Sequence, residues 1–444
     1  MKGISVSDVR NIALVGHSSS GKTSLLDNIL FKAKVSDRLG RVDEGTSFAD
    51  YTKEEKDRKI TIYTKPFHCI WQGKSLFISD NPGYIDFVGE LYASLRVADS
   101  AVILVDATSG VEVGTTKSWE ICGKFNIPRM IFINKTDKEN INFFKVVDDI
   151  RDAFGDKCIP FQIPLSPGPQ FKGVVNILEE DAEAKVPQEN KEQFNDLKKK
   201  LTELVAETDD RLIEKYLDKG TLDREEILKV LGDAVNNLNV IPILCGSAEK
   251  SIGIDEMLVL ISRYMPSPEK RGEVKGKENS SRKPSLEEPF SAFVYKTISD
   301  IYVGQMNFIR IYSGTLRSGS QVYNSTKEAT EKIGDLYLLK GKEKPVPVEE
   351  AGPGDIVVIT KLKNTFSGDT LCDQSAKIIF EKVDFPKPNT FIAVEPKAKG
   401  DEEKISNGLH KIAEEDSTVT MESCLLYTSP SPRDLSTSRM PSSA

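Results

Sequence analysis

Residues 16 to 23 read Gly16-His17-Ser18-Ser19-Ser20-Gly21-Lys22-Thr23, directly after the apolar run Asn11-Ile12-Ala13-Leu14-Val15. The string has the spacing G-x-x-x-x-G-K-[ST], and the residues from Thr23 to Lys32 favour a helix. A glycine-rich loop between a buried strand and a helix lets backbone N–H groups curl around phosphate oxygens. The sequence therefore predicts a phosphate-binding loop near the start of an α/β domain.

The first 265 residues alternate between apolar runs and helical patterns, as a mostly parallel sheet requires. Apolar runs predict strands covered on both faces at 76–79, 101–105, 130–133 and 241–244, and an edge strand at 60–71. We place this domain at 8–265. A charged, helix-rich insertion is expected at 171–240, with amphipathic helices at 190–206 and 224–236.

The remaining chain predicts smaller units. Residues 266–288 contain few apolar side chains and predict a linker. Short alternating strands broken by glycine turns predict an antiparallel β-barrel domain at 289–375. Residues 384–422 offer a strand at 391–394 and a helix at 401–414, the start of an α+β domain.

Composition excludes several classes of protein. The chain has 60 Lys and Arg against 68 Asp and Glu, a net charge of −8, so no overall positive field attracts DNA or an anionic membrane. The sequence lacks a bilayer-length apolar stretch and a secretion signal, which predicts a cytoplasmic protein without a membrane partner. Six dispersed cysteines exclude a disulfide scaffold and a zinc site. Residues 424–444, rich in Ser, Thr and Pro, are expected to be non-native sequence or a disordered tail.

A second motif predicts which base the loop accompanies. Asn134-Lys135-Thr136-Asp137 follows the run 130–133, at the edge where open α/β sheets bind ligands. The Asp137 carboxylate can accept from N1–H and the 2-amino group of guanine, whereas adenine offers neither donor. Lys135 would cover the ring plane, and Asn134 would tie this loop to the phosphate loop. Backbone N–H groups of Ser247 and Ala248 would contact the guanine O6.

Two further segments predict contacts with the far end of a triphosphate. Lys22 would reach the β and γ phosphates, and Thr23 would give its hydroxyl to Mg²⁺. Asp80, in Asp80-Asn81-Pro82-Gly83, would hold Mg²⁺ through water, and the Gly83 N–H would meet the γ-phosphate. Thr61 offers a second hydroxyl to Mg²⁺, on a polar segment that γ-phosphate would order and its loss release.

Taken in order, these elements resemble those of a translational GTPase, and the chain is most similar to elongation factor G and its EF-G-like paralogues. The strings that carry the resemblance are Gly16 to Ser24, Asp80 to Phe87, Asn134 to Asp137, Cys245 to Ala248, Tyr264 to Pro268 and Ala393 to Lys397. The resemblance covers residues 8–421. It implies a P-loop GTPase (G) domain with a helical insertion, the barrel as the second domain, and a chain truncated within the third domain, without the parts needed for translocation.

The resemblance also implies cofactors, partners and site residues. GTP or GDP and Mg²⁺ would be bound, and a monomer would contact the ribosome through the G domain and the barrel. The implied catalytic residues are Lys22, Thr61, Gly83 and Tyr84, and the implied metal residues are Thr23, Thr61 and Asp80. The implied nucleotide-binding residues are Gly16, His17, Ser18, Ser19, Ser20, Gly21, Lys22, Thr23, Ser24, Asp80, Asn81, Pro82, Gly83, Asn134, Lys135, Asp137, Ser247 and Ala248.

Four positions depart from the family pattern. Tyr84 stands where the family usually has the histidine that orients the attacking water, although the EF-G-like paralogues share the tyrosine. Ser19 replaces an aspartate, Lys59 a glycine and Asn81 a threonine. These departures affect hydrolysis more than binding.

Three hypotheses therefore stand. The first is a GTPase that acts on the ribosome as an EF-G-like factor. The second is a GTP-gated binding module with marginal hydrolysis, because of Tyr84. The third is the front half of a ribosomal-protection tetracycline-resistance protein or of a peptide-release GTPase.

Overall fold

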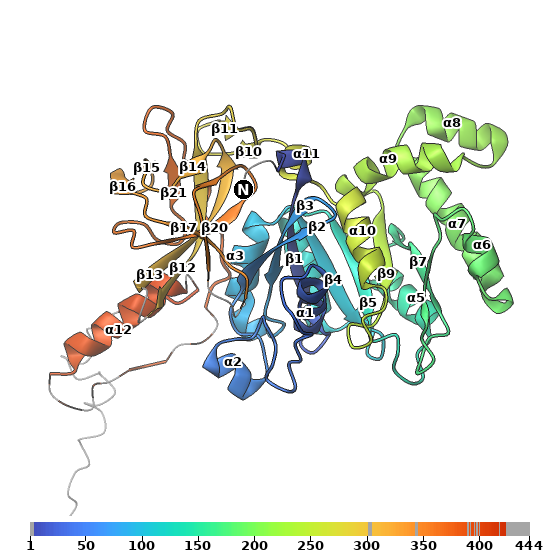
Figure 1. Ribbon diagram of the computed structural model, residues 1–444, viewed down its shortest axis with the longest axis horizontal. Coiled ribbons are helices and arrows are strands. Elements are labelled where there is room, and N and C mark those ends of the chain that lie inside the picture. Colours follow the sequence, from blue (N-terminus) through green and yellow to red (C-terminus); the bar gives the residue numbers. More distant parts are fainter. Residues whose placement is uncertain are drawn as a thin grey trace, which may run out of the picture. The chain divides into compact units, whose positions relative to one another are not determined.

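The computed structural model describes residues 4–300, 304–341, 345–388, 390, 392–394, 396, 398, 400–416 and 418–422. The chain divides into two compact units, 1–384 and 385–444. The first unit holds an α/β domain and an antiparallel sheet domain (Figure 1).

A seven-stranded sheet forms the centre of the α/β domain. Its strands are β1 (Val9–Gly16), β2 (Lys65–Trp71), β3 (Lys74–Asp80), β4 (Ser100–Asp106), β5 (Arg129–Asn134), β6 (Cys158–Pro160) and β9 (Ile241–Cys245). Their order is β2-β3-β1-β4-β5-β9-β6, and every pair is parallel except β2 with β3. The phosphate loop therefore leaves the sheet from a strand between β3 and β4, close to the loops that end both of them.

The sheet is covered by helices, so its strands are apolar along most of their length (Figure 1). The covering helices are α1 (Lys22–Lys32), α3 (Val88–Val97), α4 (Val113–Lys124), α5 (Phe143–Phe154) and α10 (Ile254–Tyr264). The short helix α2 (Lys53–Arg58) lies in the connection between α1 and β2. Short 3₁₀ turns occur at η1 (Val6–Asp8) and η2 (Ile85–Phe87). The five predicted buried strands and the edge strand all form, but 60–64 lies outside the edge strand, which begins at Lys65.

The stretch 162–236, which overlaps the insertion expected at 171–240, contains more elements than its sequence pattern indicates. Before the insertion lies β7 (Gln162–Leu165), and within it are β8 (Gly173–Asn176), α6 (Ala182–Lys185), η3 (Gln188–Asn190), α7 (Lys191–Ala206), α8 (Asp210–Lys219) and α9 (Arg224–Asn236). The two predicted helices match α7 and α9. The hairpin β7–β8 and the helix α8 were not predicted.

The stretch 266–288, expected to be a linker, has ordered structure. It forms α11 (Pro268–Arg271) and a short hairpin of β10 (Val274–Lys275) and β11 (Ser281–Arg282). The Ser267 side chain caps α11 by accepting from the Lys270 N–H, and Pro268 is buried. Capping and one buried proline therefore hold a segment that is too polar to form a core.

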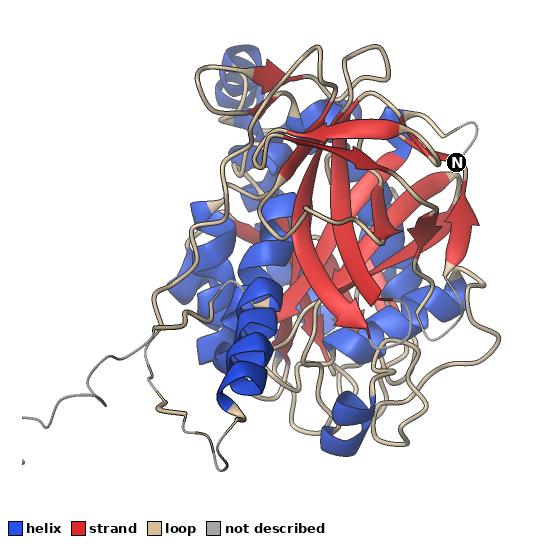
Figure 2. Cartoon of the chain, turned by 90° about the vertical axis from the view of Figure 1, so that its left-hand side faces the viewer, coloured by secondary structure: helices blue, strands red, loops and turns tan. Residues whose placement is uncertain are grey.

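The second domain is an antiparallel sheet of eight strands in the order β16-β15-β21-β12-β13-β20-β17-β18 (Figure 2). They are β12 (Ser291–Asp300), β13 (Gly304–Ser313), β15 (Gln321–Asn324), β16 (Ala329–Lys332), β17 (Leu336–Leu338), β18 (Val346–Val348), β20 (Ile356–Thr360) and β21 (Thr370–Cys372). A separate pair joins β14 (Leu316–Arg317) and β19 (Glu350–Ala351). We call this unit the barrel domain.

A buried ion pair joins the two domains of the first unit. Arg310, on β13, donates through Nη2 to both carboxylate oxygens of Asp99 at 2.9 Å, and Asn11 Nδ2 donates to Asp99 Oδ2 at 2.9 Å. Arg310 and Asp99 are both almost completely buried. Because a buried charge needs its partner, this pair ties β13 to the α/β domain.

The second unit is described over part of its length. It contains the helix α12 (Glu402–Glu415), close to the predicted 401–414. The strand expected at 391–394 is not formed in its described residues, 392–394. The tail at 424–444 lies outside the described residues.

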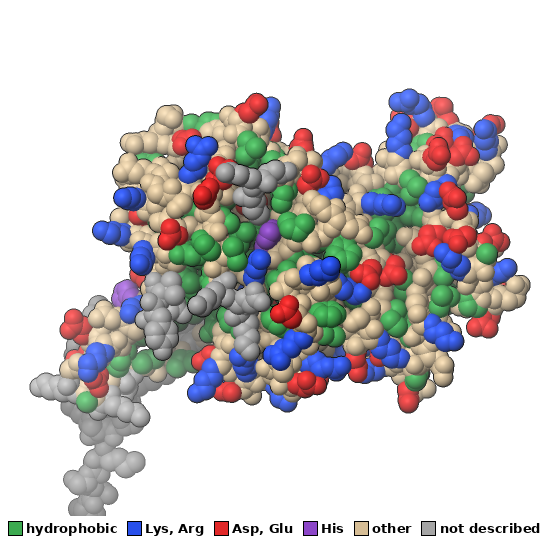
Figure 3. All heavy atoms as spheres, viewed as in Figure 1, with side chains coloured by type: hydrophobic (Ala, Val, Ile, Leu, Met, Phe, Trp, Pro, Cys, Tyr) green, Lys and Arg blue, Asp and Glu red, His purple; other side chains and the backbone are tan. Residues whose placement is uncertain are grey.

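The surface charges and the cysteines can be compared with what the composition predicts. Acidic and basic side chains are interspersed on the face shown in Figure 3, without one dominant patch of either sign. Five cysteines are free and buried, namely Cys69, Cys122, Cys158, Cys245 and Cys372. No helix among the described residues has the length and apolar character to cross a bilayer.

Buried His68 on β2 predicts a pH-dependent loss of stability. Its Nε2 lies 2.9 Å from Ser75 Oγ and its ring packs against Phe77, and burial lowers its pKa from 6.5 to about 4. Between these values the unfolded chain binds a proton that the folded chain does not, so falling pH reduces stability. Wild type should lose about 3 kcal/mol of unfolding free energy from this group between pH 7 and 4.

Urea unfolding of wild type and His68→Gln at pH 7, 6 and 5 measures this effect, and His410→Gln, on the exposed helix α12, is the matched control. The difference between wild type and His68→Gln should shrink as the pH falls. A difference that stays constant over this range would show that His68 is not held neutral.

Candidate nucleotide-binding site

The loop between β1 and α1 has the backbone shape that its glycines permit. Gly16 and Gly21 have φ of 137° and 93°, and a Cβ at Gly16 would lie 2.5 Å from the Leu104 carbonyl oxygen. Gly21 is the N-cap of α1, and no side chain caps that helix start. The first N–H groups of α1 are therefore left for a ligand, which is the arrangement that binds phosphate.

Lys22 lies folded against this loop. Its Nζ donates to the carbonyl oxygens of Gly16 at 3.0 Å and His17 at 2.7 Å. Burial lowers its pKa to about 8, and the carboxylates of Asp80 and Asp50 oppose that shift. A Cβ on Gly83 would lie 2.6 Å from Nζ, so Lys22 sits between the phosphate loop and the loop after β3.

The three predicted metal residues meet beside Lys22. Thr23 Oγ1 donates to Asp80 Oδ2 at 2.9 Å and lies 2.9 Å from Thr61 Oγ1. Thr61 Oγ1 in turn donates to Asp50 Oδ1 at 3.1 Å. Asp50 was not predicted, and it precedes Thr61 by eleven positions in a loop whose path the sequence does not indicate.

These four side chains offer only oxygen ligands. Asp80 Oδ1 and Asp50 Oδ2 are buried, and neither has a hydrogen-bond partner among the described residues. Burial raises the pKa of Asp80 to about 6 and that of Asp50 to about 7. The set is two carboxylates and two hydroxyls, and Mg²⁺ prefers oxygen ligands of this kind.

The loop after β5 contacts the phosphate loop through Asn134. Its Nδ2 donates to the Ser20 carbonyl oxygen at 2.9 Å, and its Oδ1 accepts from the Ala248 N–H at 2.9 Å. Lys135 has a φ of 63° and pairs with Asp106 at 2.6 Å. One side chain thus joins three loops, as predicted for the link to the phosphate loop.

Asp137 keeps an unused acceptor. The residue is 7 % exposed, and its buried Oδ1 has no hydrogen-bond partner among the described residues. A buried carboxylate oxygen without a donor is costly, so the position favours a ligand that supplies N–H groups.

The backbone donors predicted after β9 are engaged within the protein. The Ser247 N–H donates to the Ile252 carbonyl oxygen at 2.9 Å, and the Ala248 N–H donates to Asn134. In this conformation neither group is left for a base oxygen, because the turn at 247–252 closes on itself and Asn134 captures the other donor. The predicted O6 contacts of Ser247 and Ala248 are therefore not supported by the structure.

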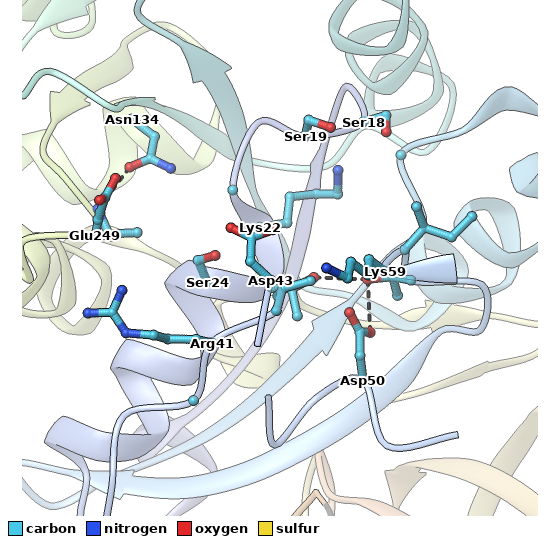
Figure 4. A pocket seen from close by; sticks show the side chains of 18 of the residues that line it. Ser18, Ser19, Lys22, Ser24, Arg41, Asp43, Asp50, Lys59, Asn134 and Glu249 are labelled. Carbon is cyan, nitrogen blue, oxygen red and sulfur yellow. Dashed lines mark hydrogen bonds between the residues drawn. The ribbon is translucent and has the colours of Figure 1, made fainter. Parts of the chain in front are cut away.

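A cavity of about 610 Å³ connects these loops (Figure 4). Figure 4 shows Lys22 near Ser18 and Ser19, with Asp50 and Lys59 on one side and Asn134 and Glu249 on the other. Predicted site residues that line it are Ser18, Ser19, Gly21, Lys22, Thr23, Ser24, Thr61, Gly83, Tyr84, Asn134, Lys135 and Ala248. Arg41 and Asp43 line it too and were not predicted.

Other predicted site residues support the cavity without lining it. They are Gly16, His17, Ser20, Asp80, Asn81, Pro82, Asp137 and Ser247. The His17 ring instead accepts from the Gly114 N–H at 3.1 Å and lies 3.4 Å from Glu112. Asp137 lies between two lining residues, Lys135 and Lys138.

Two of the departures from the family pattern have structural roles. Lys59 ends α2 in the left-handed region, with φ 56°, which is the conformation that a glycine adopts without strain. Asn81 Nδ2 donates to the Leu14 carbonyl oxygen at 3.0 Å, and its Oδ1 accepts from Thr64 Oγ1 at 2.8 Å. Tyr84 is 43 % exposed at the cavity wall.

Family models match almost the whole chain. The model for the elongation factor Tu GTP binding domain matches residues 7–267. The chain belongs to the translational GTPases of the elongation factor G family. Elongation factor G domain 2 matches residues 289–374, and elongation factor G domain III matches residues 385–423.

A solved structure supports the same assignment. The chain is similar to a protein of Thermus thermophilus, with 32 % sequence identity and a TM-score of 0.81. The match covers 94 % of this chain and 62 % of the other chain. This EF-G family chain thus has a guanine nucleotide-binding domain and further domains of a translation factor. It spans less than two thirds of the length of that relative.

Proposed function

We propose that this chain binds GTP with Mg²⁺ and hydrolyses GTP in contact with a ribosome, as a cytoplasmic EF-G-like factor. One observation carries the proposal: a single cavity runs from the Thr23 hydroxyl to Asn134 and Lys135, with unpaired buried carboxylate oxygens on both flanks in the described chain. Its volume of about 610 Å³ lies within the range of about 300–1,000 Å³ that is usual for small-molecule sites.

The phosphate end of the cavity supports a triphosphate. Lys22 donates to two carbonyl oxygens of its own loop, and phosphate oxygens, which carry more charge, would replace them. Mg²⁺ would be held by Thr23 and Thr61, with Asp80 and Asp50 behind them, and when bound it neutralises charge that develops on the phosphates. The uncapped start of α1 adds N–H donors.

The base end supports guanine. Asp137 Oδ1 needs a donor, and guanine offers N1–H and the 2-amino group to a carboxylate. Adenine would leave that oxygen unpaired and would place its own N1 acceptor against it. A site that depends on such hydrogen bonds rejects the wrong base strongly.

Tyr84 favours a second candidate function. The phenol lines the cavity where the family usually has a histidine, and a phenol cannot take a proton from water as an imidazole does. The chain would then be a GTP-gated binding module in which bound nucleotide orders residues 50–64, and hydrolysis is marginal.

Turnover with ribosomes separates the two functions. For a ribosome-coupled GTPase, we expect adding ribosomes to raise steady-state GTP turnover of wild type by about tenfold or more, less than the full contribution of a positioned catalytic group. The measurement compares wild type, Tyr84→His and, as a control, Tyr337→His, which changes a half-buried tyrosine of the barrel domain outside the cavity.

Each outcome has one reading. Stimulation of wild type supports the ribosome-coupled GTPase. Flat wild-type turnover with a large gain only in Tyr84→His supports the gated module. Flat turnover in all three proteins rejects ribosome-coupled hydrolysis for this chain.

A further inference from the structure

The barrel domain contains a buried lysine that points to the G domain. Lys296, on β12, is 4 % exposed. Its Nζ donates to a carboxylate oxygen of Glu90, at the start of α3, and to the Thr64 carbonyl oxygen at 3.1 Å. The same Nζ lies 5.4 Å from the centre of the Tyr63 ring. A buried ammonium group requires such partners, and all three belong to the G domain.

A β-bulge accompanies this side chain. Along the pair of β12 with β13, Val294 lies opposite Ile309 and Lys296 lies opposite Phe308, so Tyr295 is an extra residue. A bulge breaks the regular alternation of a strand and redirects the side chains next to it. The bulge therefore explains why a strand of a packed sheet delivers a charged group to another domain.

The partners of Lys296 are connected to the nucleotide site. Thr64 follows Thr61 by three residues, and its N–H donates to Glu90 Oε2 at 2.6 Å. Its hydroxyl donates to Asn81 Oδ1 at 2.8 Å, and Asn81 directly follows Asp80. Asn81 also donates to Leu14, in the strand that leads to the phosphate loop. Asn81, which stands where the family usually has a threonine, thus connects Thr64 to strand β1.

We propose that Lys296 is a positioning residue that holds residues 61–64 and 80–90 in the arrangement that a γ-phosphate requires. The inference rests on the proposed function. GTP must order Thr61 and Gly83 through its γ-phosphate, whereas GDP need not. Lys296 contacts Thr64 and Glu90 before any nucleotide binds, so part of the ordering of 61–64 and 80–90 is already achieved in the free protein. The position of the barrel domain and the nucleotide state are therefore coupled, and coupling is reciprocal.

Equilibrium binding of a GTP analogue and of GDP tests the proposal. We measure the affinities of GTPγS and GDP by fluorescence competition for wild type and Lys296→Met. The variant should bind GTPγS about tenfold more weakly, within the usual size of coupling between sites, and should bind GDP as wild type does. Lys296→Arg, which keeps the charge, should recover most of the loss.

A matched control exists within the barrel domain. Lys377, just after the last strand of that domain, has its Nζ 4.5 Å from the centre of the Tyr323 ring and donates to the Tyr323 hydroxyl, so both of these contacts are with β15 of the barrel domain. Lys377→Met should leave both affinities unchanged. Glu90→Gln removes the other half of the pair and should repeat the selective loss, which covers the case in which Lys296→Met does not fold.

The outcomes distinguish the two proposals. Failure of wild type to bind guanine nucleotides would reject the proposed function and this inference with it. A wild-type protein that binds both nucleotides, with an unchanged ratio in Lys296→Met or in Glu90→Gln, would overturn the inference alone. A uniform loss of both affinities would also overturn it, because it would mark Lys296 as a purely structural residue.

Discussion

Replacing Asp137 with asparagine should weaken GTP binding by about a thousandfold. The carboxylate would lose two charge-assisted hydrogen bonds of about 2 kcal/mol each, and about 1.4 kcal/mol corresponds to a factor of about ten. The amide would also direct one N–H at a guanine donor. Asp137 Oδ1 is buried and has no hydrogen-bond partner in the described chain, so its acceptor capacity remains for the base.

The same variant should change which base is preferred. Xanthine has a carbonyl oxygen in place of the 2-amino group, so the asparagine amide would find an acceptor there. Calorimetric titration with GTP, XTP and ATP measures this, with the exposed Asp156→Asn as a matched control. Equal GTP and ATP affinities in wild type, or unchanged discrimination in Asp137→Asn, would remove Asp137 from the base pocket.

Gly21→Ala should have the second-largest effect on GTP binding, at the phosphate loop. Gly21 has φ of 93°, and a Cβ there would lie 2.2 Å from Asn134 Nδ2. The alanine would be strained by about 1–3 kcal/mol, and it would displace the amide that bonds to Ser20. We expect the free loop to relieve this strain by moving, whereas the bound loop must keep its shape, so the strain opposes binding. Together with about 1 kcal/mol for the lost hydrogen bond, it should lower GTP affinity roughly a hundredfold.

A substitution at a second glycine separates the effect of backbone strain from the effect of the steric clash. Gly73, in the turn between β2 and β3, has φ of 80°, and a Cβ there would meet nothing within 4 Å. Gly73→Ala carries the backbone strain without the clash, so its melting temperature should fall while its GTP affinity stays near wild type. Equal nucleotide affinities in the two variants would show that the contact between Gly21 and Asn134 does not organise the site.

Much of the fold could be predicted because its strands are buried on both faces. Runs such as 101–105 are apolar at every position, and such runs need no tertiary information to be recognised. Short elements could not be predicted in this way. The strand β6 has only three residues, too few for a pattern to be recognised. In contrast, α8 has apolar residues at 212, 213, 216 and 217, which is amphipathic helical spacing that was not used to predict it. A neighbouring helix also contacts α8, through the bond from Tyr216 to Glu203.

The site residues also fall into two groups, those that lie in local motifs and those that folding brings together. Lys22, Thr23 and Asn134 lie in motifs whose spacing reflects local geometry, so sequence alone indicates them. Asp50 has no such spacing, because it reaches Thr61 only after the chain folds back around α2. The use of the Ala248 N–H was missed for a similar reason, since it depends on a competing acceptor from a distant loop.

The pair of Arg310 and Asp99 limits how freely the barrel domain could be exchanged for one from another protein. The family model for the second domain begins at residue 289, yet separating the chain there would remove the counterion of Asp99, which is buried in the intact chain. Grafting a foreign second domain onto this GTPase would need an arginine at the same register. The two domains are interchangeable only if this arginine, and the buried Lys296 that pairs with Glu90, are transplanted with them.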